Sequence, residues 1–233
     1  RDHAVGNLII AALADMAGGF CEGVEQAARF LRVRGRVYPA STESLTLVVR
    51  YEDGTVVRGE SVVGRLGGRI ERVGVEPRGA PAPPAVLEAI EGADVVVLSP
   101  GSLFTSTIPS LLGGGVREAL ARFGGPVLYA ANVMTQPGET SGFGAADHVR
   151  AISRHVGPVV TDVLVHRGRL PRAVLDRYAA KGAFPVEVDR GELEREGVRV
   201  READLLSGRW EAGIRHDPEK LAREVCEAAL VRL

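Results

Sequence analysis

The sequence predicts an α/β protein: a Rossmann-like parallel sheet with helices on both faces and a β-hairpin excursion. In the second half, the short apolar runs 93–100, 126–134 and 159–166 alternate with stretches of helical periodicity. Strands that are apolar throughout and separated by helices are typical of a parallel sheet covered on both faces. In the first half, an Asp-Gly pair lies between two alternating stretches of residues 45–61, which is the pattern of a β-hairpin.

The elements of the first half follow from residue spacing and turn residues. Leu8, Leu13 and Met16 recur on one helical face, and two glycines after them end the helix. A proline pair marks the start of a later helix. In chain order we expect helices over 7–19 and 20–33, a strand over 36–41, the hairpin over 45–61, a strand over 69–77 and a helix over 81–93.

The second half alternates strands and helices with short connections. Asp217 is the expected N-cap of the closing helix and Pro218 its first residue. No internal repeat, low-complexity segment or long linker interrupts the chain, so we expect one domain over residues 1–233. The expected strands cover 93–100, 126–134, 159–166 and 184–189, and the expected helical segments cover 108–125, 145–157, 172–182 and 217–233.

The composition excludes several classes of function. The chain has 233 residues and a formal net charge of −1 with no long basic stripe, which argues against nucleic-acid binding. No apolar run approaches the roughly 18–20 residues that a membrane span needs. Cys21 and Cys226 lie far apart and lack the spacing of a zinc site or a disulfide framework. We therefore expect two core thiols in a reducing cytoplasm.

Three polar clusters fall where strands of the expected sheet end. SPGSLFTS (99–106) follows one buried strand, ANVMTQPGETSGF (131–143) follows the next, and Arg215-His216 precede the closing helix. Because ligands of open parallel sheets bind beyond the carboxyl ends of the strands, we expect the clusters to line a binding site.

The residue types in these clusters suit an oxygen-rich, anionic ligand. Gly101 lets the backbone approach closely, and the hydroxyls of Ser102, Thr105 and Ser106 can donate to phosphate oxygens. Free N–H groups at a helix start favour an anion, and Arg215 can make a bidentate contact to phosphate. Asn and Gln side chains suit base edges or sugar hydroxyls. The residues therefore indicate a nucleotide or another phosphorylated ligand.

Each cluster also has a structural interpretation that the sequence leaves open. The hydroxyls of 99–106 could serve as helix caps and turns, 131–143 could be a polar loop, and Arg215-His216 could be a solvated pair. His148 and His155, seven residues apart on one helix, favour a structural role over a metal site. The motifs GxGxxG, GxxxxGK[ST] and GxSxG are absent.

Four segments, in the same order, resemble those of one known family. HAVGNLIIAAL (3–13) resembles its GHxxGNLLLAAL, and SPGSLFTSTIPSLL resembles its GPGSLYTSxxPNLL. NVMTQPGETSGF followed by DHV resembles NxMTQxGETxGYTxxDHV, and IRHDPEKLA (214–222) resembles RHDxxKLA. The chain is identified on these segments as a member of the gluconeogenesis factor family (YvcK type) of the CofD-like superfamily. The resemblance covers nearly all of the chain.

This resemblance implies a CofD-like α/β fold and a cytoplasmic bacterial protein needed for cell shape and envelope homeostasis on gluconeogenic carbon sources. It implies binding of a UDP-sugar, UDP-N-acetylglucosamine, without established turnover, and with no certain cofactor. The 2-phospho-L-lactate transferase branch instead moves a phospholactyl-type group from a guanosine diphosphate carrier to a deazaflavin, with Mg²⁺. A homodimer is implied only by the fold family.

Carried over position by position, the resemblance also implies the ligand-binding residues, while catalytic residues stay unassigned. They are Gly6, Asn7, Gly101, Ser102, Thr105, Ser106, Asn132, Thr135, Gln136, Gly138, Glu139, Thr140, Asp147, His148, Arg215 and His216, with Asp217 completing the RHD block.

The sequence also departs from the family pattern. Ser99 replaces a glycine, Ser110 an asparagine, Phe104 and Phe143 tyrosines, and Gly144 a threonine. The family's opening GGGTG strand–loop–helix and DDGGSSG loop, which should supply the first parallel strand and much phosphate and metal binding, are absent. Since the chain also starts without methionine, we expect an N-terminal portion to be missing from this sequence.

Three functions remain open from the sequence. The first is a regulator that binds a nucleotide sugar, the second is a CofD-class transferase, and the third is a scaffold that acts through protein contacts. The YvcK-type form of the MTQxGET and RHD blocks favours the first.

Overall fold

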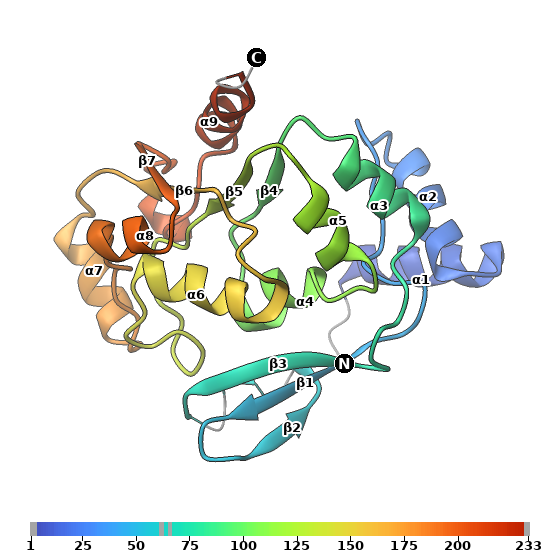
Figure 1. The fold of residues 1–233 in the computed structure, drawn as a ribbon, viewed down its shortest axis with the longest axis horizontal. Helices are drawn as coiled ribbons and strands as arrows, with labels where there is room; N and C mark the ends of the chain where they lie inside the picture. Colours follow the sequence, from blue (N-terminus) through green and yellow to red (C-terminus); the bar gives the residue numbers. More distant parts are fainter. Residues whose placement is uncertain (1–3, 61–62, 65–66, 231–233) are drawn as a thin grey trace.

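The computed structural model describes residues 4–60, 63–64 and 67–230, which form an α/β fold with two sheets (Figure 1). The larger sheet is parallel, and its strands follow one another in the order β4-β5-β6-β7. Those strands are β4 (Val96–Leu98), β5 (Val127–Ala130), β6 (Asp162–His166) and β7 (Arg199–Ala203). The alternation of apolar runs and helices in the second half is therefore confirmed.

Helices cover both faces of the parallel sheet, as expected. Helices α5 (Val116–Arg122), α6 (Ala145–Val156) and α8 (Arg190–Arg195) connect consecutive strands. Because such crossovers are right-handed in nearly all proteins, connections that step the same way along a sheet bring their helices to one face. Helix α9 (Pro218–Leu230) follows the last strand and lies on the opposite face (Figure 1).

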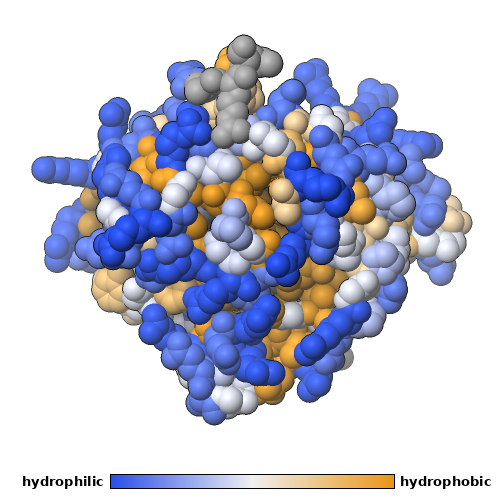
Figure 2. Space-filling model, viewed as in Figure 1, coloured by the Kyte–Doolittle hydropathy of each residue, from blue (hydrophilic) through white to orange (hydrophobic). Residues whose placement is uncertain are grey.

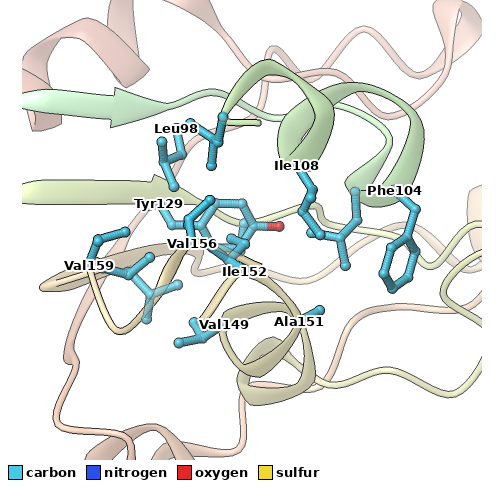
Figure 3. Close-up of a cluster of buried hydrophobic side chains, with 14 of the residues drawn as sticks. Leu98, Phe104, Ile108, Tyr129, Val149, Ala151, Ile152, Val156 and Val159 are labelled. Carbon is cyan, nitrogen blue, oxygen red and sulfur yellow. The ribbon is translucent and has the colours of Figure 1, made fainter. Parts of the chain in front are cut away.

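Two hydrophobic clusters correspond to these two faces. On the face covered by α6, Tyr129 of β5 packs with Ile152 of α6 in one extended core (Figure 3). Val163 of β6 belongs to the same core. On the other face, Leu128 and Leu164 pack with the side chains of α9. Successive strand residues thus alternate between two cores, which explains why these strands are apolar throughout.

A smaller antiparallel sheet contains β1 (Thr46–Tyr51), β2 (Val56–Arg58) and β3 (Ile70–Glu76), in the order β2-β1-β3. The expected hairpin is confirmed up to residue 60, since Ser61 lies outside the described residues. Gly54 has φ 86°, the left-handed conformation that a tight turn of this kind favours. Leu47, Val49 and Tyr51 point inward and join the extended core.

The buried side chain of His155 joins this sheet to the rest of the molecule. Its Nδ1 lies 2.6 Å from the Ala151 carbonyl oxygen, and its Nε2 accepts a hydrogen bond of 3.0 Å from the N–H of Val73 in β3. Burial lowers the pKa of His155, so the neutral ring that can accept from Val73 is favoured. The structural role expected for His155 is thus the one that these contacts support.

Helices α1 (Val5–Ala17) and α2 (Phe20–Phe30) pack against each other at the N-terminal side, with α3 (Pro84–Glu91) following the antiparallel sheet in the chain. A Cβ on Gly23 of α2 would overlap the backbone of Ala14 in α1, so glycine permits this close packing. α1 has no buried residue among those described.

The remaining elements are short. They are a π-helical turn at Leu103–Thr107, α4 (Ile108–Ser110), α7 (Arg172–Ala179) and a 3-10 turn at Trp210–Ala212. None of the helices in the described part of the chain is both long and apolar enough to cross a membrane.

Two predicted strands are wrong. Residues 36–41 and 184–189 have irregular backbone, apart from one isolated bridge between Met134 and Pro185. Each segment contains a proline, which cannot donate to a strand ladder. α8 and β7 were not predicted, and the second helix ends at Phe30 rather than at residue 33. The last three residues of the predicted closing helix lie outside the described residues.

Candidate functional site

The loops that follow β4 and β5 are joined by hydrogen bonds at the carboxyl edge of the parallel sheet. The side-chain amide of Asn132 donates to the Gly101 carbonyl oxygen at 2.8 Å. The amide of Gln136 donates to the Ser102 hydroxyl oxygen at 2.7 Å. The first two polar clusters predicted from the sequence therefore form one surface.

The first loop is shaped by a π-helical turn. The N–H groups of Ser106 and Thr107 both donate to the Ser102 carbonyl oxygen, at 2.9 Å each. Phe104, buried within the turn, anchors it to the core, while Thr105 is half-buried and Ser106 is exposed. π-helical turns are rare and frequent at functional sites, since the extra residue redirects the side chains around it.

The second loop is a tight turn closed by Thr140. Its hydroxyl accepts from the Gln136 N–H at 2.9 Å, and its N–H donates to the Gln136 carbonyl oxygen at 2.9 Å. Gly138 has φ 79°, and a Cβ there would overlap the backbone of Gly64. Glycine is thus required for the turn and for its contact with the segment that follows β2.

Thr135 has a structural partner of its own. Its N–H donates to the Phe184 carbonyl oxygen at 2.7 Å, and its hydroxyl accepts from the Phe184 N–H at 2.9 Å. These two bonds hold the segment after α7 against the site loop. These hydrogen bonds explain why Thr135 is buried, and no ligand is needed to explain it.

Glu139 is half-buried beside a cleft of about 230 Å³ that Arg69 and Ser141 also line. Burial raises the pKa of the Glu139 carboxyl, and a nearby Glu60 acts in the same direction, against a backbone hydrogen bond from Phe104. Its Oε2 is buried and has no hydrogen-bond partner. The Glu139 carboxyl therefore has an oxygen that can accept a further hydrogen bond.

The Asp147-His148 pair begins α6. Asp147 accepts from the Gly144 N–H at 3.0 Å and from the Arg150 guanidinium at 2.9 Å. Burial alone would raise the pKa of Asp147, but these hydrogen bonds outweigh it and leave the pKa below its usual range. Both carboxylate oxygens are thus engaged in starting the helix.

His148 is fully buried, and its Nδ1 lies 2.8 Å from the Gly144 carbonyl oxygen. Its ring stacks on Tyr129 and meets Phe143 edge-on. Burial lowers the pKa of His148 and favours the neutral ring.

The third cluster, Arg215-His216, lies beside the end of β7. An isolated bridge pairs Leu206 with His216, and the Arg215 carbonyl oxygen accepts from the Ser207 N–H at 3.2 Å. Arg215 is exposed and, among the described residues, has no ion-pair partner. The expected cap is confirmed: Asp217 accepts from two backbone N–H groups at 3.0 and 3.1 Å.

His166 was not predicted, and it links the third cluster to the others. It is the last residue of β6 and lines, with Asn132, a cavity of about 110 Å³. Burial lowers the pKa of His216, and the proximity of His166 lowers it further. Its place at the end of an apolar strand was a sequence signal that could have identified it, because that position faces the carboxyl edge.

Unpartnered buried polar atoms concentrate at the predicted site. In the described part of the chain, five buried side-chain atoms have no hydrogen-bond partner. Four of them belong to predicted residues: Gln136 Oε1, Glu139 Oε2, His148 Nε2 and His216 Nε2. Buried polar groups in native proteins nearly always have a partner, so these atoms mark the places where the protein does not itself supply one.

Two predicted residues are not brought into these contacts. Gly6 and Asn7 lie exposed in the first turn of α1, and a Cβ on Gly6 would meet no atom within 4 Å. For metals, no group of three or more His, Cys, Asp or Glu side chains suited to an ion occurs over 4–60, 63–64 and 67–230.

Comparison with known proteins matches this chain to one family over most of its length. The model of the family described as 2-phospho-L-lactate transferase CofD matches residues 1–206. A relative from Deinococcus radiodurans is 43% identical over 234 residues, which cover 99% of this chain and 48% of that protein. The chain thus spans about half the length of this relative and of one from Nostoc.

Two further relatives, both named gluconeogenesis factor, are covered more completely. The one from Halalkalibacterium halodurans is 39% identical, and the match covers 97% of this chain and 70% of that protein. The one from Bacillus subtilis is 38% identical, with 94% and 69% covered.

Among solved structures, a crystal structure of a Bacillus halodurans protein matches with a TM-score of 0.93 and 39% identity, covering 96% of this chain and 72% of that chain. A second crystal structure, described as a member of the UPF0052 family, matches with a TM-score of 0.92.

Proposed function

The chain belongs to the CofD family and to its gluconeogenesis factor members, and from this premise we propose that it binds a nucleoside-diphosphate sugar at the carboxyl edge. The ligand we propose is UDP-N-acetylglucosamine. The observation that carries the proposal is the concentration of unpartnered buried polar atoms at Gln136, Glu139 and His216. Sugar hydroxyls, the acetamido N–H and the uracil N–H are donors that could complete them.

The diphosphate would lie over the loop after β4. Ser102 accepts from Gln136 through its oxygen, so its own hydrogen remains free to donate. Thr105 and Ser106 lie on the same turn and can donate to further phosphate oxygens. Arg215 has no carboxylate partner among the described residues and can supply the compensating charge.

Binding without turnover would make this protein a sensor. We propose that it acts in the cytoplasm, as a regulator of cell shape and envelope homeostasis during growth on gluconeogenic carbon sources. The proposal names no metal ion, and the titration below therefore compares the ligands with and without Mg²⁺.

A thermal-shift titration of the full-length protein tests the ligand. UDP-N-acetylglucosamine, UDP and GDP are compared with buffer, with and without Mg²⁺, and the ligand is recovered for mass spectrometry. A saturable rise in the melting temperature with the UDP-sugar, and recovery of that sugar unchanged, support the proposal. No response to any UDP compound contradicts it.

A matched pair of variants locates the binding. Gln136→Ala removes an unpartnered acceptor and the bond to Ser102, whereas Gln26→Ala changes an exposed glutamine of α2. We expect only the first to weaken binding of the UDP-sugar, by about tenfold. Equal affinities for the two variants would exclude Gln136 from the site.

The cellular role needs a separate test. In a bacterium that lacks its own gluconeogenesis factor, the wild-type protein should restore normal cell shape on a gluconeogenic carbon source, and a variant unable to bind the UDP-sugar should not. Full restoration by that variant would favour a scaffold that acts through protein contacts.

The second candidate is a transferase, favoured by the CofD family match. It would move a phospholactyl-type group from a guanosine diphosphate carrier to a deazaflavin. A thermal response to GDP instead of UDP compounds, followed by a mass shift of a deazaflavin acceptor, would favour this function.

A further inference from the structure

The outer face of the antiparallel sheet carries a concentration of arginines. Arg50 of β1 lies directly opposite Arg72 of β3. On the other side of β1, Arg58 of β2 lies opposite Val48, which is two residues from Arg50 on the same strand. Because strand residues alternate between faces, these side chains share the face opposite the core. In Figure 2, the lower part of the view, where this sheet lies, shows hydrophilic side chains with apolar ones between them.

Arg50 and Arg72 differ from the arginines of β7 and α6, which share carboxylate partners. On β7, Arg199 and Arg201 both contact Asp162, at 3.1 and 2.8 Å. Arg150 of α6 likewise contacts three carboxylates. Such bridging carboxylates are the usual arrangement where guanidinium groups come close together.

No such bridge joins Arg50 and Arg72, which have no ion pair within the described residues. On this face only Glu76 pairs with an arginine, Arg58, at 3.0 Å. Like charges directly opposite one another on neighbouring strands are unfavourable, so an anion between them would stabilise the face.

The face is also hollowed. A groove of about 670 Å³ has Arg50, Arg58, Arg72 and Arg78 on its walls, together with Glu76. Gly74 lies between these residues, and a Cβ there would meet nothing within 4 Å. The missing side chain leaves the groove open at its centre.

The floor of the groove is apolar. Val48 of β1, Val56 of β2 and Leu112 contribute apolar lining. A volume of this size and a mixed apolar and cationic lining suit a small molecule. Guanidinium groups match phosphate oxygens in a bidentate geometry that an ammonium cannot reproduce.

We propose that this arginine groove binds a small molecule carrying two or more phosphate groups, at a site separate from the carboxyl edge. The groove shares no lining residue with the carboxyl-edge residues described above. The buried inner face of the sheet, with Val49 and Tyr51, packs on the core instead. Four guanidinium groups against one carboxylate, in a chain whose net charge is −1, make the face selectively anion-binding.

Calorimetric titration of the full-length protein with inorganic tripolyphosphate tests the proposal. The double variant Arg50→Gln/Arg72→Gln removes the two opposed charges. The control Arg117→Gln/Arg223→Gln removes two exposed arginines elsewhere, on α5 and α9. We expect the first variant to bind tripolyphosphate at least tenfold more weakly than the wild type, and the control to bind it as the wild type does.

Arg215→Ala separates the two sites. If tripolyphosphate occupies the groove, this variant keeps the tripolyphosphate affinity, whereas Arg50→Gln/Arg72→Gln keeps the response to UDP-N-acetylglucosamine. Unchanged affinity in Arg50→Gln/Arg72→Gln, or loss of tripolyphosphate binding in Arg215→Ala alone, would overturn the proposal. Circular dichroism confirms that both variants are folded before they are compared.

Two further titrants identify the chemistry. Citrate offers a similar charge on carboxylates, and vesicles with phosphatidylserine offer phosphate on a surface. We expect citrate to bind at least fivefold more weakly than tripolyphosphate, and the vesicles not to bind. Equal binding of citrate, or binding of vesicles without binding of tripolyphosphate, would contradict a small polyphosphate as the ligand.

Discussion

Buried polar groups have partners within the protein at one end of the parallel sheet and lack them at the other end. At the amino end, Asp162 is fully buried and accepts from the Thr161 hydroxyl at 2.7 Å and from the guanidinium of Arg201 at 2.8 Å. At the carboxyl end, Gln136 and His216 hold buried atoms that have no partner. One end is complete within the protein, and the other is not.

Because of this difference, the two ends of the sheet should contribute to different properties, one to stability and the other to ligand binding. Where a buried carboxylate is fully paired, removing it is costly, because its partners then lose their compensating charge. A buried acceptor without a partner weakens the folded state until a ligand supplies the donor. We therefore expect substitutions at the amino end to change stability, and substitutions at the carboxyl end to change binding.

The largest expected effect is at the amino end. Asp162→Ala leaves Arg199 and Arg201 without their carboxylate. Because both guanidinium groups can still reach solvent, we expect a loss of about 2–4 kcal/mol in the free energy of unfolding, less than for a fully enclosed pair. Urea denaturation measures it, and Asp176→Ala, which breaks an exposed pair with Arg172, should cost under about 1 kcal/mol.

The affinity of Asp162→Ala for UDP-N-acetylglucosamine should stay unchanged wherever the variant is folded. A loss of affinity in folded protein would show that the two ends are coupled, and would break the comparison.

The next effect is at the carboxyl end. Arg215→Ala should weaken ligand binding by about 1.5–3 kcal/mol, since it removes a charge-assisted contact to phosphate. Its free energy of unfolding should change little, because Arg215 is exposed and unpaired among the described residues. Calorimetry compares it with Arg223→Ala on α9, which should bind normally. An unchanged dissociation constant in Arg215→Ala would remove this residue from the site.

A smaller effect tests a carboxyl-edge residue that is already satisfied. Asp217 caps α9 through the N–H groups of Glu219 and Lys220. Asp217→Ala should cost about 1 kcal/mol of stability, whereas Asp217→Ser, which can still cap, should cost less. A melting temperature that does not move in Asp217→Ala would mean that the cap contributes nothing to stability.

The smallest expected effect is a gain in stability rather than a loss, and it concerns Glu139. The pKa of Glu139 is raised in the folded state, so the folded protein binds the proton more tightly than the unfolded chain does. Stability is then highest below the unfolded pKa of about 4.3 and falls as the pH rises through the folded pKa. Glu139→Gln should raise the melting temperature at pH 7 by about 1–3 °C while weakening ligand binding.

Melting curves between pH 4 and pH 8 check this prediction. The advantage of Glu139→Gln should shrink toward pH 4, where the wild-type carboxyl becomes increasingly protonated in the unfolded state as well. A variant that is less stable than the wild type at pH 7 would show that the Glu139 carboxylate stabilises the fold.

Much of the fold could be predicted because it depends on local patterns. The apolar runs gave the positions of β4, β5 and β6, and the Asp-Gly turn gave the hairpin. β7 was missed because its sequence, RVREA, is mostly polar. Two of its arginines are compensated by Asp162, 37 and 39 residues earlier in the chain, and spacing alone does not reveal such a pairing.

The site was predicted in part for the same reason. Gly101, Ser102, Asn132 and Gln136 lie in two loops whose place at the strand ends follows from the strand pattern, and the hydrogen bonds between those loops confirm their proximity. Thr135 could not be assigned its partner, Phe184, because that contact spans 49 residues.

The sequence by itself determined the α/β class, the carboxyl-edge loops and the family. The tertiary structure alone decided which polar groups have partners. Asp162 is paired and Gln136 Oε1 is not, and Arg50 lies opposite Arg72 on the neighbouring strand. The physical reason is that periodicity reports which residues are buried or exposed along one element. Hydrogen-bond satisfaction and charge pairing depend on which elements meet, and that is set only when the chain packs.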